Sequence, residues 1–215
     1  TITGTNGKST TCQLLYEILL NQKIDAKLVG NIGTPILSVD KVNKKTIFVI
    51  EASSYQLEYS KIFKSKYAAI LNISPDHIER HRTLKKYIRA KFKLLKNQSK
   101  GHFAFVKKDD FLTRKELKKI RLYCKVKKVN TEKNNKLIEN TNNEYLLTET
   151  NKENFLFALE ISKKLKLKVI EKDISLKEVY TFNESFVTAT GWGICSVKSL
   201  SKKIFKNQKY TKLIQ

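Results

Sequence analysis

The segment Thr3-Gly-Thr-Asn-Gly-Lys-Ser-Thr10 constrains the fold of this 215-residue chain more than any other feature. It follows the apolar residue Ile2 and leads into residues 9–20, whose apolar side chains recur at helical spacing. A glycine-containing turn between a strand and a helix lets successive backbone N–H groups face one anion, and the helix dipole adds to the attraction. The sequence therefore predicts a phosphate loop.

The residue types in this segment suit a nucleoside triphosphate. Gly4 and Gly7 allow the backbone to curl, Lys8 can reach the β- and γ-phosphates, and Ser9 can offer its hydroxyl to Mg²⁺. Ile2 stands where the general phosphate-loop motif has its first glycine. The alternative interpretation is a glycine-rich turn that only caps a helix.

Two continuous apolar runs, residues 46–50 and 67–73, predict strands that are buried on both faces of a parallel sheet. The first run ends at Glu51, which we expect at the carboxyl edge of the sheet beside the phosphate loop, as a magnesium ligand or, alternatively, as a glutamate in solvent. Strands alternating with helices predict an α/β fold with a mostly parallel sheet flanked by helices. The other expected elements are strands at 1–3, 26–29, 102–106, 122–129 and 145–147, helices at 83–96, 110–120 and 151–165, and a polar loop at 131–144.

The formal charge of +23 points first to nucleic acid, but the kind of cation and its distribution argue against it. Only 5 of the 43 basic residues are Arg, the residue favoured for bidentate contacts with phosphates and bases. Residues 61–135 hold 23 basic and 6 acidic residues, whereas the phosphate loop lies in a nearly neutral part of the chain. We expect a solvated Lys-rich surface and keep a nucleic-acid-binding module as the alternative.

Composition also bears on whether the chain forms a core, spans a membrane or forms disulfides. Hydrophobic residues make up 40% of the chain, enough for a core, and no run approaches the ~18–20 apolar residues of a membrane-spanning helix. The three cysteines, Cys12, Cys124 and Cys195, are scattered, so we expect reduced thiols in a cytoplasmic protein. No Met occurs, even at position 1, and the chain is therefore expected to begin after the start of its gene.

Five motifs in order carry a resemblance to a known family. They are Thr3–Thr10 as spelled out above, Gly30-Asn-Ile-Gly33, Glu51-Ala-Ser-Ser-Tyr-Gln-Leu-Glu58, Asn72-Ile-Ser-Pro-Asp-His-Ile-Glu-Arg-His81 and Tyr87-Ile-Arg-Ala-Lys91. Over about residues 1–165 the chain resembles the central, ATP-binding domain of the Mur ligases. The segment from Ser53 to Glu58 is most similar to the members that add D-glutamate to UDP-N-acetylmuramoyl-L-alanine. Other Mur-type ligases and folylpolyglutamate synthase share the phosphate loop and remain alternatives.

The resemblance implies an ATP-dependent acid–amino-acid ligase of peptidoglycan precursor synthesis. ATP phosphorylates the substrate carboxylate, and the amine of D-glutamate displaces phosphate from the acyl phosphate to form an amide. Such a reaction needs cations and positioning more than a nucleophile from the protein. A phosphate-loop protein that uses hydrolysis as a switch is a further alternative.

The resemblance also implies roles for individual residues. Lys8 would hold the γ-phosphate, Ser9 and Glu51 one Mg²⁺, and His77 a second Mg²⁺. Lys91 matches a lysine that CO₂ carbamylates, which would turn a cation into an anionic oxygen ligand. Asn31 and Ser53 match positions near the muramoyl substrate, and Asn154 matches an adenine contact, although Thr148 and Thr150 replace a Gly and a His beside it. The ATP-binding set is Gly4, Thr5, Asn6, Gly7, Lys8, Ser9, Thr10 and Asn154; His81 is given at most a place next to the site and His102 no role.

Domain organisation is the last expectation. Residues 1–166 are assigned to the central domain, and neither the UDP-binding domain nor the C-terminal domain of the family is recognised, so the isolated chain is expected to be a monomeric fragment that is inactive in ligation. Residues 167–215 form a tail of uncertain fold. Within it, residues about 168–199, which include Ser185-Phe-Val-Thr-Ala-Thr-Gly-Trp192, resemble part of a class IV pyridoxal-phosphate aminotransferase; the alternative is a divergent or misjoined tail.

Overall fold

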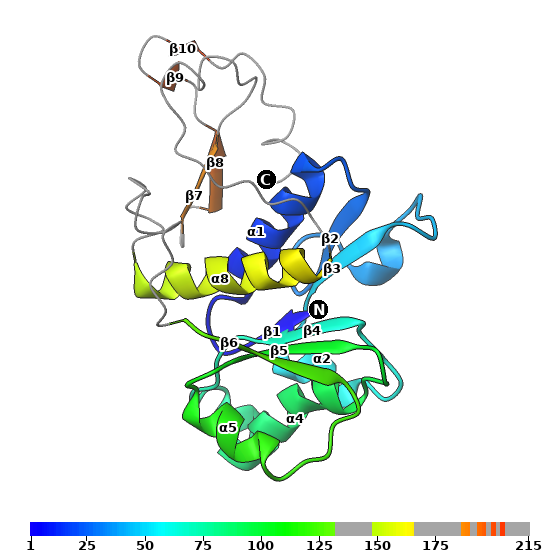
Figure 1. The fold of residues 1–215 in the computed structure, drawn as a ribbon, viewed down its shortest axis with the longest axis vertical. Coiled ribbons are helices and arrows are strands. Elements are labelled where there is room, and N and C mark those ends of the chain that lie inside the picture. The colour runs from blue at the N-terminus through cyan, green and yellow to red at the C-terminus, as the bar shows by residue number, and fades with distance from the viewer. Residues whose placement is uncertain (132–147, 166–185, 190–192, 197–198, 201–202, 205–215) are drawn as a thin grey trace.

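The computed structural model describes residues 1–131, 148–165, 186–189, 193–196, 199–200 and 203–204 (Figure 1). The polar loop expected at 131–144, apart from Thr131, and the strand expected at 145–147 lie outside the described residues. So does the aminotransferase-like segment, apart from residues 186–189, 193–196 and 199. In the tail, β7 (Phe186–Ala189) pairs with β8 (Gly193–Ser196), and β9 (Ser199–Leu200) with β10 (Lys203–Ile204), both antiparallel.

A six-stranded parallel sheet organises residues 1–131 and confirms the expected fold class. The strand order is β2-β3-β1-β4-β5-β6, with β1 in the interior of the sheet. The chain leaves β1 for one half of the sheet and later returns to the other half, so the carboxyl end of β1 is a topological switch point, where ligands of such sheets bind. The strands are β1 (Ile2–Thr3), β2 (Ala26–Gly30), β3 (Ile47–Glu51), β4 (Tyr67–Ile70), β5 (Phe103–Lys107) and β6 (Lys125–Val129).

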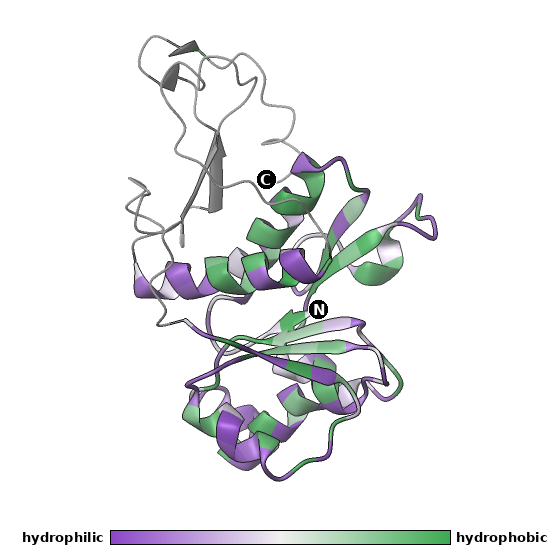
Figure 2. Ribbon diagram, in the orientation of Figure 1, coloured by the Kyte–Doolittle hydropathy of each residue, from purple (hydrophilic) through white to green (hydrophobic). Residues whose placement is uncertain are grey.

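Helices cover both faces of the sheet (Figure 1). On one face α1 (Lys8–Asn21) packs against α8 (Glu149–Lys164), and their apolar side chains share a core with the sheet (Figure 2). On the other face α2 (Ser54–Tyr59), α4 (Leu84–Lys96) and α5 (Phe111–Leu117) enclose a second core. The described part of the chain thus has three layers, with the sheet between two layers of helices. The apolar strands expected from the sequence lie in this middle layer and are buried on both faces.

Three short elements were not expected from the sequence. The 3₁₀ helix η1 (Ile36–Ser38) and the one-turn helix α3 (Ile78–His81) are too short to produce a periodic pattern. Helix α2 begins with a capping box, in which the Ser53 side chain accepts from the backbone N–H of Gln56 and the Gln56 side chain accepts from the backbone N–H of Ser53. The strand expected at 67–73 ends at Ile70, because the chain turns after it to enclose the phosphate loop.

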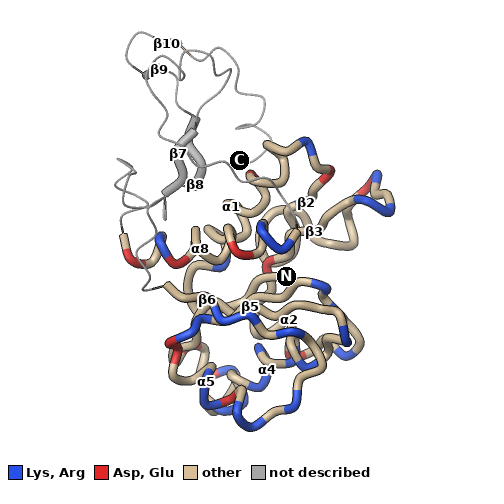
Figure 3. Tube along the Cα trace, viewed as in Figure 1, with Lys and Arg blue, Asp and Glu red and all other residues tan. Residues whose placement is uncertain are grey.

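The excess of lysine lies on the surface of the lobe formed by α4, α5 and β6 (Figure 3). The edge strand β6 exposes Lys125, Lys127 and Lys128, and lysines on an edge strand discourage pairing with another chain. Lys127 also forms an ion pair with Glu160 of α8. Among the described residues, no helix is long and apolar enough to cross a membrane.

Candidate functional site

The phosphate loop stands at the carboxyl end of β1 and runs directly into α1. Its last glycine, Gly7, has a φ of 80°, and a Cβ at this position would lie 2.0 Å from Oδ1 of Asn154. Asn72, after β4, holds the loop from the other side: its Oδ1 accepts from the N–H of Asn6 over 2.9 Å and its Nδ2 donates to the carbonyl of Asn6 over 3.2 Å. The loop is therefore held in shape by contacts from two distant parts of the chain.

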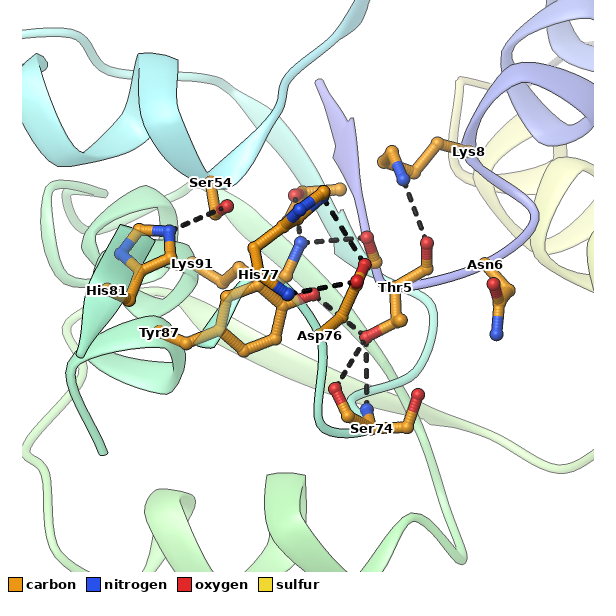
Figure 4. A network of polar contacts seen from close by, with 12 residues as sticks. Thr5, Asn6, Lys8, Ser54, Ser74, Asp76, His77, His81, Tyr87 and Lys91 are labelled. Atoms are coloured by element: carbon orange, nitrogen blue, oxygen red, sulfur yellow. Dashed lines mark hydrogen bonds and ion pairs between the residues drawn. The ribbon is translucent and has the colours of Figure 1, made fainter. Parts of the chain in front are cut away.

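Two sources of positive potential meet at this loop. Lys8 folds back and donates from Nζ to the carbonyl of Thr5 over 2.9 Å (Figure 4). The N–H groups in the first turn of α1 have no partner within the helix and carry the positive end of its dipole. Loop, lysine and helix start together form a cradle for phosphate groups.

Glu51 ends β3 at the same edge of the sheet and is 1% exposed. Its Oε2 accepts from the Ser9 hydroxyl over 2.7 Å, and its Oε1 accepts from Nδ2 of Asn31 over 2.9 Å. Among the described residues, no lysine, arginine or histidine forms an ion pair with this carboxylate. A buried carboxylate that is held by neutral donors beside a phosphate cradle fits the binding of a divalent cation.

Lys91 reaches the underside of the loop from α4. Its side chain is buried, and Nζ donates to the carbonyl of Gly4 over 2.7 Å and to Oγ1 of Thr3 over 3.4 Å. The ammonium also lies 4.7 Å from the centre of the Tyr87 ring. Burial, with a smaller contribution from the nearby charge of Lys8, lowers the pKa of Lys91 to about 7.

His77 faces the phosphate loop from the turn after β4 (Figure 4). Its backbone has a φ of 52°, in the left-handed region, and its N–H donates to Oδ1 of Asp76 over 2.9 Å. The ring remains about half exposed, with Nε2 3.4 Å from Oδ2 of Asp76 and the ring centre 5.1 Å from that of Tyr55. An exposed imidazole beside a carboxylate is available to a ligand.

Asn154 and Ser53 occupy structural positions as well as predicted functional ones. Oδ1 of Asn154 accepts from the Thr11 hydroxyl over 3.3 Å, and Nδ2 lies 3.4 Å from Oδ1 of Asn151, so this buried amide braces the phosphate loop from behind. Ser53 is the N-cap of α2, with its hydroxyl toward Gln56. The predicted contacts of Asn154 with adenine and of Ser53 with substrate stay predictions.

A sequence model of the Mur ligase middle domain matches residues 2–174. The chain belongs to this family. This Mur ligase middle domain is 45% identical over 114 residues to UDP-N-acetylmuramoylalanine–D-glutamate ligase of Caldicellulosiruptor bescii, an alignment that covers 53% of this chain and 25% of the relative. The enzyme of the same name from Clostridioides difficile is 41% identical over 134 residues, which cover 60% of this chain and 30% of the relative. The matched part thus spans only about a quarter to a third of these curated relatives.

Solved structures show the same fold. MurF ligase of Thermotoga maritima, in complex with ADP, superposes with a TM-score of 0.60 at 20% identity over 79% of this chain and 46% of that chain. A UDP-N-acetylmuramoyl-L-alanyl-D-glutamate–2,6-diaminopimelate ligase gives a TM-score of 0.56 at 19% identity over 88% of this chain and 48% of that chain.

This Mur ligase middle domain brings most of the predicted site residues to one edge of its sheet. Ser9, Asn31 and Glu51 are in direct contact, and Lys91 is bound to the loop that contains Lys8. Two further side chains, to which the sequence motifs assign no role in the site, also contact the phosphate loop. Asn72 clamps the loop, and the hydroxyl of Tyr87 lies 3.0 Å from Oγ1 of Thr5.

The positions of these two residues contained a readable signal. Asn72 is the first polar residue after an apolar strand, the place where site residues of parallel sheets stand. Tyr87 lies one helical turn before Lys91 and therefore on the same face of α4. Among the described residues, no three His, Cys, Asp or Glu side chains form a ready-made metal site. A cation here would need Glu51, the Ser9 hydroxyl and ligands from a bound nucleotide.

Proposed function

We propose that this chain is the nucleotide- and metal-binding part of an ATP-dependent ligase that adds D-glutamate to UDP-N-acetylmuramoyl-L-alanine. The observation that carries the proposal is the buried Glu51 carboxylate, which the Ser9 hydroxyl joins to the phosphate loop over 2.7 Å. The names of the relatives support this choice of substrates over those of other Mur-type ligases. The ADP complex of the related MurF supports ATP as the nucleotide.

The phosphate loop would bind ATP through residues 4–10. Its backbone N–H groups and the start of α1 would face the phosphates, and Lys8 would exchange the carbonyl of Thr5 for the γ-phosphate. Asn154 would contact adenine, as the family resemblance implies, from a position next to Gly7. These contacts neutralise negative charge, which is the main requirement when phosphate is transferred to another anion.

Ser9 and Glu51 would hold a magnesium ion, and His77 would approach a second. When bound, Mg²⁺ neutralises charge on the phosphate oxygens. Lys91 would react with CO₂ to form a carbamate, and its lowered pKa supports this, because only the neutral amine attacks CO₂. Asn31 and Ser53 would face the muramoyl substrate from the same edge of the sheet.

The residues of the chain would act by position and charge rather than as nucleophiles. An oxygen of the substrate carboxylate attacks the γ-phosphorus and ADP leaves; the amine of D-glutamate then attacks the acyl carbon, phosphate leaves and a proton is lost. Lys8 would stabilise the charge on the transferred phosphoryl group. Asn31 and Glu51 would fix the geometry at the edge of the sheet where the substrate carboxylate meets the γ-phosphate.

Ligation would also require parts of the enzyme that residues 1–166 do not supply. The matched region is about a quarter of the length of its relatives, so we assign UDP binding and amino-acid binding to other domains. We place the protein in the cytoplasm as a monomer and treat residues 167–215 as a separate tail.

Calorimetric titration of the full 215-residue chain with ADP, with and without Mg²⁺, tests the proposal. In the same titration with a non-hydrolysable ATP analogue, which carries the γ-phosphate that Lys8 would hold, Lys8→Ala should weaken Mg²⁺-dependent binding about 10-fold or more, because a hydrogen bond to a charged group contributes about 1.5–3 kcal/mol. Lys85→Ala, which removes an exposed lysine of α4, is the matched control and should bind normally. Absence of Mg²⁺-dependent binding, or equal effects of the two variants, would refute the proposal.

The same protein samples decide between the remaining alternatives. Binding of single-stranded nucleic acid that falls steeply with salt and is indifferent to Lys8→Ala would favour the Lys-rich nucleic-acid module. Release of phosphate from ATP without a muramoyl acceptor would favour a hydrolytic switch.

A further inference from the structure

His81 is the one histidine of the chain whose side chain is fully buried, and it is not among the residues proposed to bind nucleotide, metal or substrate. It ends α3, and its ring stacks on that of Tyr55 with centres 5.5 Å apart and an angle of 16° between the planes. Its edge meets the Tyr87 ring, at 5.4 Å and 63°. His81 therefore packs between side chains of two helices, α2 and α4.

Both ring nitrogens of His81 face groups on α2. Nε2 lies 3.0 Å from the Ser54 hydroxyl, and Nδ1 lies 3.7 Å from Oε2 of Glu58. A neutral imidazole has one N–H, and a proton on Nδ1 would face the carboxylate while Nε2 accepts from the serine. Burial lowers the pKa of His81, and the nearby Glu58 carboxylate opposes this shift in part.

The two rings that contact His81 are the same two that contact His77. Tyr55 lies 5.1 Å and Tyr87 6.5 Å from the His77 ring, centre to centre. The Tyr87 hydroxyl continues to Oγ1 of Thr5, which also donates to the carbonyl of Ser74 and accepts from its N–H (Figure 4). These contacts form one connected cluster from α2 through His81 to the phosphate loop.

His77 needs such support because its backbone is unfavourable by itself. A non-glycine residue in the left-handed region persists only where its surroundings hold it. The ring is about half exposed and has Tyr55 and Tyr87 as its aromatic neighbours. The ring is therefore placed by these two tyrosines together with Asp76, whose Oδ2 lies 3.4 Å from Nε2 of His77.

We propose that His81 is a positioning residue, which locks Tyr55 and Tyr87 so that His77 points toward the phosphate loop. The contacts that place His77 all come from this chain, and only the consequence of this placement for catalysis rests on the proposed function. His81 touches neither substrate nor metal; it acts through two tyrosine rings and, through Ser54, on the start of α2.

Imidazole NMR spectra of the full chain without nucleotide test this directly, because the chain has only three histidines. The ring protons of His77 should be displaced from those of a free histidine by the neighbouring tyrosines. His81→Ala should move the His77 signals toward free-histidine positions, and His81→Phe, which restores a stacking ring, should return them. The signals of His102, which precedes β5 and is not part of the cluster, report whether the fold is intact.

Tyr55→Leu provides a second route if His81→Ala does not fold. Tyr55 is only partly buried, so the chain should keep its fold while the His77 signals move as they do without His81. Unchanged His77 signals in either folded variant, or no recovery in His81→Phe, would overturn the inference. Failure of the unaltered chain to bind Mg-ADP would instead count against the proposed function and leave this result standing.

Discussion

The hydroxyl of Ser9 lies 2.7 Å from Oε2 of Glu51, so the first turn of α1 is joined to the carboxyl end of β3. The other oxygen of this carboxylate accepts from Asn31, which follows β2. The start of α1, the loop after β2 and the end of β3 thus meet at one buried carboxylate. The charge stands 42 residues from Ser9 in the sequence and is brought there by the parallel register of the sheet.

Glu51→Gln should remove the Mg²⁺ dependence of nucleotide binding while leaving the fold intact. Glutamine keeps the shape of the side chain and can still accept from the Ser9 hydroxyl, but it carries no charge for a cation. We expect the ratio of the ADP dissociation constants without and with Mg²⁺ to fall about 10-fold or more, equivalent to about 1.4 kcal/mol. Calorimetry at two Mg²⁺ concentrations measures this ratio.

Glu116→Gln is the control for this experiment. Glu116 lies on α5, where its carboxylate pairs with Lys119 at 3.4 Å, and the change in net charge is the same. If both variants lowered the ratio equally, the effect would come from overall charge and not from a metal ligand.

Gly7→Ala should be more destabilising than a comparable change elsewhere. The new Cβ would combine a φ of 80° with an approach of 2.0 Å to Oδ1 of Asn154. Gly101 has a φ of 90° but nothing within 4 Å of its Cβ position, so Gly101→Ala isolates the backbone cost of about 1–2 kcal/mol. Urea unfolding should show a larger loss for Gly7→Ala, part of which Asn154→Ala restores in the double variant. Equal losses for the two glycines would mean that the loop moves aside freely.

Ser53→Ala should cost about 1 kcal/mol through loss of the N-cap of α2. Ser53→Asp keeps an acceptor for the N–H of Gln56 and should unfold at nearly the same urea concentration as the unaltered chain. If the aspartate variant lost as much stability as the alanine variant, the serine hydroxyl would act through a contact other than the cap.

The local features of the site could be predicted from the sequence because each is written in a few adjacent residues. The phosphate loop needs two glycines, a lysine and a serine in one turn, and Glu51 follows directly on an apolar strand. The fold class followed in the same way from the alternation of strands and helices. The capping box of α2, with Ser53 followed three residues later by Gln56, was also readable, but the helix of six residues is too short for a periodic pattern.

The long-range contacts could not be predicted in this way. The motifs give His81 at most a place next to the site, and its burial results from the packing of α2 against α4, which places Ser54 next to it across 27 residues of sequence. Asn72 likewise finds Asn6 only because β1 and β4 are neighbours in the sheet. Contacts of this kind depend on the order of the strands and the packing of the helices, which cannot be derived from the spacing of the motifs.

Lys91 makes the stability of the chain depend on pH in a direction that can be worked out. Its pKa is about 7 in the folded chain, against 10.5 for an ordinary lysine, so between these values the unfolded chain binds more protons. The free energy of unfolding should therefore rise with pH, by on the order of 1.4 kcal/mol per pH unit, between about pH 7 and 10.5. Lys91→Met, which fills the same space without a charge, should lack this contribution.

The measurement is the difference in unfolding free energy between the unaltered chain and Lys91→Met, by urea titration in CO₂-free buffers from pH 6 to pH 10. All other titrating groups are common to both proteins, and Lys85→Met on the exposed side of the same helix is the control for replacing a lysine by methionine outside the site. Added bicarbonate should alter only the chains that keep Lys91, because a carbamate removes the amine. A pH-independent difference for Lys91→Met would show that the ammonium is not held at a desolvated position.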